Sequence, residues 1–181
     1  MRTDRLGWSG RLPKALYSLA TKLVPVPCVD VLPYRVLDED VVQIGLIQRL
    51  DPHGQVVWNM VGGGIHRRES VAEAAARHIR ETLGPDVTWD DSCFSNPITV
   101  GEYFPVRRAA SGYDPRKHAI APTYAVPISG AVSTGGEAIS FRWFSEDDLP
   151  LDAIGFGQAN LIRRMLPLMG REGLEPSTDG L

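Results

Sequence analysis

The chain has 181 residues, of which 43% are hydrophobic, enough for one domain with a substantial core. Its net charge of −3 argues against bulk nucleic-acid binding, which needs a strongly basic surface. No stretch approaches the twenty apolar residues of a membrane span, and basic residues interrupt any secretory signal near the start. Two widely spaced cysteines, Cys28 and Cys93, form no zinc pattern and favour a reducing compartment, so we predict a soluble, cytoplasmic protein.

Apolar periodicity divides the chain into three parts. Leucines at 12, 16, 19 and 23 predict an amphipathic helix that packs on the domain, so residues 1–26 are expected to form an N-terminal helical extension. Residues 27–169 are expected to form the domain itself. The segment 170–181 is rich in turn formers and has little to bury, which predicts a flexible tail.

Within the domain, runs of β-branched and apolar residues predict strands, and turn residues separate them. A polar loop follows at 107–117, and apolar spacing predicts a last helix at 156–169. Together with a central helix, these elements predict an α/β fold with a mixed β-sheet sandwiched between α-helices. The predicted strands are 28–36, 41–50, 55–61, 98–106, 119–128 and 138–144.

The central helix lies in "GGGIHRRESVAEAAARHIRETLG", residues 62–84. One stripe of this helix is apolar, and Gly84 followed by Pro85 ends it. Its other face carries Glu73, Arg77, Arg80 and Glu81, with His78 and Thr82 on a flank. One interpretation is an ordinary solvated face, on which charged pairs contribute only a few tenths of a kcal/mol.

A second interpretation comes from the spacing of six residues. It resembles the Nudix box at Gly63, Glu69, Arg77, Ile79, Glu81 and Gly84. Three positions depart from the box, because His78 and Thr82 replace glutamates and Pro85 replaces an aliphatic residue. The resemblance extends over about residues 27–168 and implies the Nudix fold. "RHIRETLG", "GYDPRKHAIAPTY" and "FRWFSEDDLP" also look like a Nudix-like family of unassigned activity, and the GDP-mannose mannosyl hydrolases are more distantly similar.

The resemblance also implies site residues. Glu69 and Arg77 are expected to pair and to brace the box, while Glu81 and a carbonyl such as that of Gly63 hold Mg²⁺ or Mn²⁺ against a diphosphate. Aligned on the later "RW" pair, Glu137 takes the place of a metal ligand of the mannosyl hydrolases. Helical spacing adds that His78, Glu81 and Thr82 can face one ion.

Other candidates would contact the substrate or move a proton. Arg49 resembles a phosphate-contacting arginine of the mannosyl hydrolases. In the polar loop, Arg116 and its neighbour Lys117 can meet phosphate, Tyr113 can stack on a base, and His118 can act as a general base. A mobile polar loop explains Arg116, Lys117 and Tyr113 equally well, and an ordinary exposed loop histidine is the commoner interpretation of His118.

These residues lead to two alternatives. The first is a metal-dependent hydrolase of a nucleoside diphosphate linked to another moiety, such as a nucleotide sugar, with Glu81, His78 and His118 as catalytic residues. The second is a Nudix-like module that has lost catalysis and binds a nucleotide or sugar nucleotide as a sensor. In both, the partner is a small molecule and neither a nucleic acid nor a membrane, and assembly into a homodimer stays open.

Overall fold

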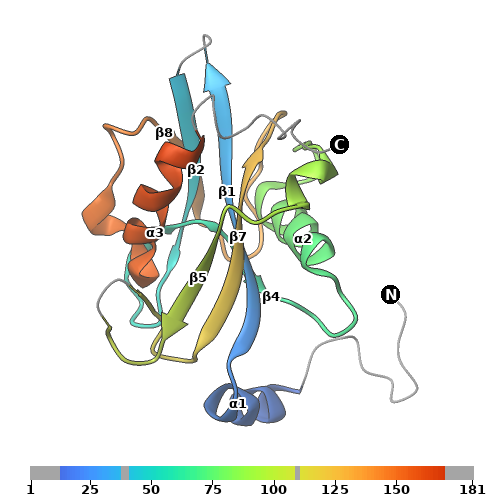
Figure 1. Ribbon diagram of the computed structural model, residues 1–181, viewed down its shortest axis with the longest axis vertical. Helices are drawn as coiled ribbons and strands as arrows, with labels where there is room; N and C mark the ends of the chain where they lie inside the picture. Colours follow the sequence, from blue (N-terminus) through green and yellow to red (C-terminus); the bar gives the residue numbers. More distant parts are fainter. Residues whose placement is uncertain (1–12, 38–40, 109–110, 170–181) are drawn as a thin grey trace, which may run out of the picture.

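The computed structural model describes residues 13–37, 41–108 and 111–169. The predicted tail at 170–181 and the first twelve residues of the N-terminal extension lie outside these ranges. A curled mixed sheet forms the centre, with helix α2 (Val71–Leu83) on one side and helix α3 (Gln158–Met165) on the other (Figure 1). The predicted α/β fold, a mixed sheet between helices, is therefore confirmed.

The sheet has eight strands, and its main path runs β3-β2-β1-β7-β5-β6. The long central strand β1 pairs parallel with β7 and antiparallel with β2 and β4, while β8 pairs with β2. The strands are β1 (Val26–Leu37), β2 (Val41–Leu50), β3 (Val56–Asn59), β4 (Val61–Gly64), β5 (Thr99–Phe104), β6 (Gly112–Tyr113), β7 (Ala119–Pro127) and β8 (Ser140–Phe144).

The predicted strand at 55–61 is in fact two strands, separated at Met60. Residues Val56–Asn59 pair with β2, whereas Val61–Gly64 pair with β1. The chain therefore changes partner strands at Met60, and its backbone N–H at this point bonds a side chain instead of a strand. This change places the glycine turn beside β1.

Helix α2 begins and ends where its sequence indicates. Ser70 and Glu73 form a reciprocal capping box, and the helix ends at Gly84, whose φ is +96°. Its apolar stripe packs on the sheet, where Ala75, Ile79 and Leu83 have no exposed surface. The prediction that Gly84 ends the helix is confirmed.

The last predicted helix, 156–169, is shorter than expected. A 3-10 turn at Gly155–Gly157 precedes α3, and Phe156 in this turn has the left-handed φ of +56°, which is uncommon outside glycine. A second 3-10 turn, Leu166–Met169, contains Pro167, which cannot donate the hydrogen bond that continues an α-helix. The turn before α3 directs Phe156 toward the site described below.

Helix α1 (Lys14–Leu23) forms, but its predicted packing on the domain is wrong. It has no buried residue, and its leucines are largely exposed: 46% for Leu16, 55% for Leu19 and 71% for Leu23. In Figure 1 it lies at the lower end of the molecule, and β1 begins three residues after the helix ends.

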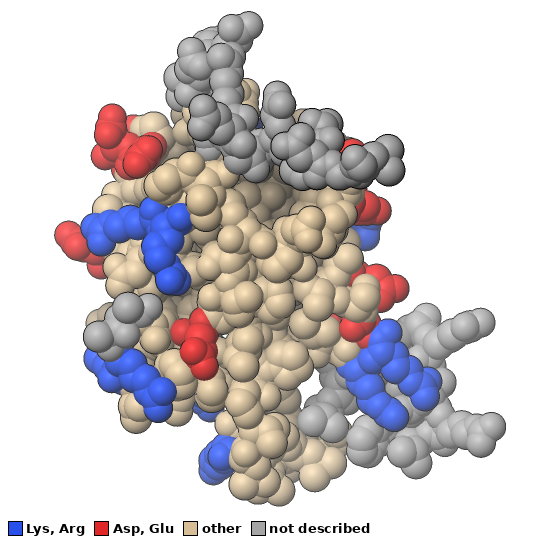
Figure 2. Space-filling view, viewed as in Figure 1, with Lys and Arg blue, Asp and Glu red and all other residues tan. Residues whose placement is uncertain are grey.

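The surface mixes both signs of charge. On the face shown in Figure 2, lysine and arginine side chains alternate with aspartate and glutamate side chains around a broad uncharged centre. Within the described ranges, no helix is both long enough and apolar enough to cross a membrane.

Candidate functional site

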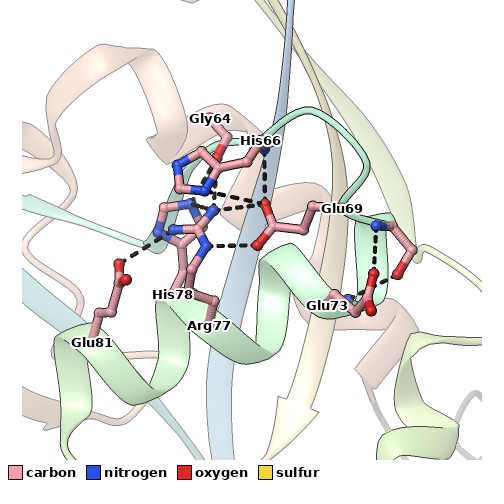
Figure 3. A network of polar contacts seen from close by, with 8 residues as sticks. Gly64, His66, Glu69, Glu73, Arg77, His78 and Glu81 are labelled. Atoms are coloured by element: carbon pink, nitrogen blue, oxygen red, sulfur yellow. Dashed lines mark hydrogen bonds and ion pairs between the residues drawn. The ribbon is translucent and has the colours of Figure 1, made fainter. Parts of the chain in front are cut away.

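Arg77 is the centre of a polar network between α2 and the turn that follows β4 (Figure 3). Its Nε and Nη2 donate to the two carboxylate oxygens of Glu69 at 2.6 and 2.9 Å, and Nη2 also donates to the carbonyl of Gly64. Glu69 in turn accepts the backbone N–H of His66. The hydrogen bonds from Arg77 lower the pKa of Glu69 to about 2. This is the brace that the resemblance implies.

Glu81, the predicted metal ligand on the helix, takes part in the same network. Its carboxylate accepts from Arg77 Nη1 at 3.2 Å, and its side chain is about half exposed. It lines an apolar groove of about 640 Å³ between α1 and the turn. The arginine that braces Glu69 therefore also holds Glu81.

His78 lies directly under the glycine turn. Its Nε2 is 3.2 Å from the Gly64 carbonyl and 3.4 Å from Arg77 Nη2, so this nitrogen is engaged in either tautomer. A Cβ at Gly63 would lie only 2.6 Å from the imidazole, so glycine is needed there to admit the ring. Burial, followed by the charge of Arg77, lowers the pKa of His78.

The predicted meeting of His78, Glu81 and Thr82 at one ion is not what the structure contains. Thr82 is 7% exposed and lines neither the groove nor the cavity described next. The loop before β8 covers this part of α2, with Gly135 donating to the Thr82 carbonyl and Ser133 to that of Leu83. Thr82 is thus on the packed side of the helix.

A cavity of about 270 Å³ opens on the other side of the glycine turn. It brings together five of the predicted site residues from distant parts of the chain: Arg49, Gly63, His78, Arg116 and Glu137. Its charged lining combines three cations with three carboxylates. These are Arg49, Arg116 and Lys117, and Asp30, Asp114 and Glu137.

Both arginines of the cavity hold a carboxylate. Arg49 Nη1 contacts Glu137 Oε1 at 2.5 Å, and the exposed fractions of the two side chains are 17% and 52%. Arg116 makes a two-pronged contact with Asp114, 2.8 Å to each oxygen. Lys117 lies 3.5 Å from the Cys28 sulfur and from the Tyr17 hydroxyl. The two guanidinium groups that an anion would contact in the cavity are therefore already paired with carboxylates of the protein.

Tyr113 and His118, predicted as a stacking ring and a general base, lie outside this cavity. His118 stacks on Phe104, with its Nε2 3.1 Å from Glu102. The ring of Tyr113 faces the guanidinium of Arg107. Neither is among the described residues that line the cavity, so the loop delivers Arg116 and Lys117 to it but not the predicted base or stacking ring.

A polar network of the cavity, formed by Asp30, Asn59, Tyr103 and Gln158, was not predicted. Asp30 is 7% exposed and accepts a hydrogen bond of 2.5 Å from the Tyr103 hydroxyl, and Gln158 connects this pair to Asn59. Burial raises the pKa of Asp30 to about 6. A signal was present in "CVDVL", where one carboxylate interrupts a buried strand, because a buried carboxylate needs partners.

The predicted metal ligands do not converge. Gly63 and Glu137 line the cavity, whereas Glu81 is held by Arg77 beside the separate groove. In the part of the chain that the structure describes, no three His, Cys, Asp or Glu side chains are placed to hold a metal ion. Magnesium prefers six oxygen ligands in near-octahedral geometry. The donor set in this arrangement therefore does not fit a metal held by the protein alone.

Comparison with known proteins gives a family and a similar structure. The family described as "Domain of unknown function (DUF4916)" matches residues 7–171. A crystal structure from Jonesia denitrificans, described as a possible asymmetric diadenosine tetraphosphate hydrolase, is 33% identical. The match covers 80% of this chain and 94% of that chain, with a TM-score of 0.74. No curated protein matches the chain.

More distant structures share the fold. A bifunctional NMN adenylyltransferase/ADP-ribose pyrophosphatase from Francisella tularensis, complexed with AMP and a manganese ion, is 17% identical with a TM-score of 0.63. The match covers 87% of this chain and 45% of that one. The Nudix domain of Shewanella oneidensis NrtR, complexed with ADP-ribose, is 18% identical over 86% of this chain and 98% of that chain, with a TM-score of 0.58.

Proposed function

The chain belongs to the Nudix hydrolase superfamily, and we propose from this premise that it binds a nucleoside diphosphate linked to another moiety. The phosphates would lie against Arg49, Arg116 and Lys117, beside the glycine turn. One observation carries this proposal: three cations from two distant segments meet in one cavity with the backbone of Gly62 to Gly64. The binding domain is residues 27–169, with 1–26 as its extension.

Phosphate binding requires that carboxylates leave the arginines. Glu137 is half exposed, and an ion pair with an exposed partner contributes only about 0–1 kcal/mol, so its displacement costs little. A phosphate offers more charge and a geometry that matches the guanidinium fork. We therefore expect Glu137 to occupy Arg49 until a phosphate replaces it.

The nature of the ligand is suggested by the similar proteins. Their descriptions name diadenosine tetraphosphate, ADP-ribose and AMP, all of which are nucleotides. Such ligands are small and anionic, as the cavity requires. A cytoplasmic setting, in which free thiols such as Cys28 and Cys93 stay reduced, is part of this proposal.

Binding, and not metal-dependent cleavage, is the function that the geometry favours, because Glu81 and Glu137 are each held by an arginine. Hydrolysis with Mg²⁺ or Mn²⁺ is the second candidate. The Arg77–Glu69 pair favours it, since this is the contact that the resemblance to the Nudix box implies. Hydrolysis requires that Glu81 leaves Arg77, or that Glu137 leaves Arg49, so that the freed carboxylate and the phosphate oxygens can bind a metal cation together.

Calorimetry and product analysis together distinguish the two. Wild-type protein is titrated with ADP-ribose, diadenosine tetraphosphate and pyrophosphate in EDTA, and again with Mg²⁺ or Mn²⁺, while chromatography monitors cleavage. We expect binding in EDTA and at least a tenfold loss for Arg49→Ala and Lys117→Ala. Arg163→Ala, on the exposed face of α3, is the matched control. Cleavage with metal selects the second candidate, and no binding under any condition contradicts the proposal.

A further inference from the structure

Helix α1 lies on the domain with its apolar face turned outward. Helical spacing places Leu16, Leu19 and Leu23 on one face, which we call the leucine face. The opposite face is polar, and its members are Lys14, Ser18, Thr21 and Lys22. An amphipathic helix of a globular protein normally turns its apolar face to the core. In α1, Ala20 and Thr21 are partly buried whereas the three leucines are exposed, so the described residues leave the leucine face uncovered.

The leucine face is a ridge and not a groove. Two grooves border α1, one toward the glycine turn and the other toward the loop that precedes β7. Leu16 and Leu19 line neither of them. A protein that receives a helix or an extended peptide does so in a groove or at a sheet edge. The leucine face offers neither of these, but it can lie on a broad surface.

The surroundings of the leucine face are basic. Helix α1 contains two lysines and no acidic residue. Among the described residues, six cations and one carboxylate, Glu81, line the two grooves. The cations are Lys14, Lys22, Arg67, Arg77, Arg116 and Lys117.

This excess of positive charge is local. Three further carboxylates pair with residues that line the grooves, namely Glu69, Glu102 and Asp114, and cations still outnumber carboxylates when these are included. The chain as a whole has a net charge of −3. In Figure 2, blue side chains lie on both sides of the lower end of the molecule, where Figure 1 places α1. The end of the molecule that carries the leucine face therefore attracts anions.

A second copy of the chain fits this end poorly. Two-fold self-association places the same surface patch of both subunits against each other. The lysines of α1 in one copy would then lie near those of the other, and like charges across an interface are unfavourable. The partner of the leucine face must instead be apolar where it meets the leucines and negatively charged around them.

We propose that α1 docks the protein on the surface of an anionic lipid membrane. Leu16, Leu19 and Leu23 enter the boundary between headgroups and acyl chains, and Lys14 and Lys22 contact the negative headgroups. Helices with a leucine face and a lysine-containing polar face lie in the plane of such a surface. Anionic lipids supply both the apolar and the negative partner.

This inference goes beyond the proposed function and does not depend on the ligand of the cavity. The helix has ten residues, so it lies on the membrane and does not span it. The sequence alone predicted no membrane partner. The outward leucine face, in a basic surrounding, is the reason to propose one.

Sedimentation of the full chain with lipid vesicles tests the proposal. Wild-type protein should bind vesicles of phosphatidylcholine and phosphatidylserine, and should not bind phosphatidylcholine alone. Leu16→Gln/Leu19→Gln should weaken binding at least about tenfold, because two leucine side chains no longer leave water. Lys14→Gln/Lys22→Gln should also weaken it about tenfold, through lost attraction to the headgroups. Glutamine has a helix propensity close to that of leucine and lysine, so α1 should persist, which circular dichroism checks.

Two exposed residues far along the chain provide matched controls. Leu168→Gln and Arg163→Gln should change vesicle binding by less than about twofold. Binding of ADP-ribose by Leu16→Gln/Leu19→Gln should equal that of wild type. This second measurement separates a failure of the membrane proposal from a failure of the proposed function.

Four outcomes would overturn the membrane proposal. Wild-type protein binds neither kind of vesicle, or the leucine variant binds anionic vesicles as well as wild type, which means that charge alone adsorbs the protein. In ultracentrifugation without lipid, a dimer that Leu16→Gln/Leu19→Gln dissociates would show that a second copy covers the leucine face. Binding to polyglutamate that is as tight as binding to anionic vesicles, and equally sensitive to the leucine variant, would identify an acidic protein as the partner.

Discussion

Arg77 binds Glu69 through two guanidinium nitrogens, at 2.6 and 2.9 Å, and so fastens the turn after β4 to helix α2. Arg77→Ala should therefore lower the free energy of unfolding by about 2–3 kcal/mol, because a partly buried carboxylate and the Gly64 carbonyl lose their donor. Urea unfolding measures this. Arg163→Ala, an exposed arginine on a different helix, should change stability by less than about 0.5 kcal/mol.

Arg49→Ala should show the opposite pattern, with weaker ligand binding and little change in stability. A large loss of stability in Arg49→Ala together with a small one in Arg77→Ala would mean that the roles of the two arginines are reversed.

The raised pKa of Asp30 predicts a pH-dependent stability. Burial raises this pKa from 3.8 to about 6, so the folded protein holds a proton between these values that the unfolded chain has released. Stability from this group is fully present below pH 3.8 and is lost as the pH rises through about 6. The difference in unfolding free energy between wild type and Asp30→Asn should change over pH 4–6 and be constant above pH 7. A difference that stays constant throughout would show that Asp30 titrates normally.

Glu137 competes with phosphate for Arg49 in the proposed binding mode. Glu137→Gln should therefore tighten binding of pyrophosphate in EDTA, by about threefold if the ion pair contributes within its usual range of about 0–1 kcal/mol. Glu146→Gln, an exposed glutamate beyond β8, is the control. If Glu137→Gln instead weakens binding only when Mg²⁺ is present, Glu137 contacts a metal ion, and the second candidate function gains support.

His78 and Thr82, which replace glutamates of the box on α2, should give different results when each is changed to glutamate. Thr82 is buried, so Thr82→Glu should lower the melting temperature equally with and without Mg²⁺, because a charge is buried unpaired. His78 lines the cavity, so His78→Glu should be less stable in EDTA and recover with Mg²⁺ by mass action. Glu81→Gln should leave the magnesium response unchanged. Recovery of Thr82→Glu with Mg²⁺ would show that this position faces the cavity.

The exposed leucines of α1 should contribute little to the folded monomer. Leu19→Ala should change the free energy of unfolding by less than about 0.5 kcal/mol, whereas Leu83→Ala in the core should cost about 2–5 kcal/mol. A larger loss in Leu19→Ala that grows with protein concentration would indicate that a second copy of the chain covers α1 in a homodimer.

Several features of this protein follow from its sequence alone, because they depend on residues close together in the chain. The end of α2 at Gly84 needs only a residue that accepts positive φ before a proline. Glu69 and Arg77 are eight residues apart on a turn and the helix it leads into, and the resemblance of this stretch to the Nudix box implied that they pair. Most of the strands likewise followed from local runs of apolar residues, but the separate strand β4 and the short strand β6 did not.

Tertiary structure decided the rest. Asp30 and Tyr103 are 73 residues apart, and Asn59 and Gln158 are 99 apart, so no local pattern reveals that they share a network. The Glu81 carboxylate is held by a hydrogen bond from Arg77, which depends on how the turn after β4 packs on α2. The exposure of α1 likewise depends on where the helix lies relative to the domain. Spacing sets which residues lie on one helical face, but the loop before β8 packs on α2 and determines that Thr82 is covered while His78 faces the cavity.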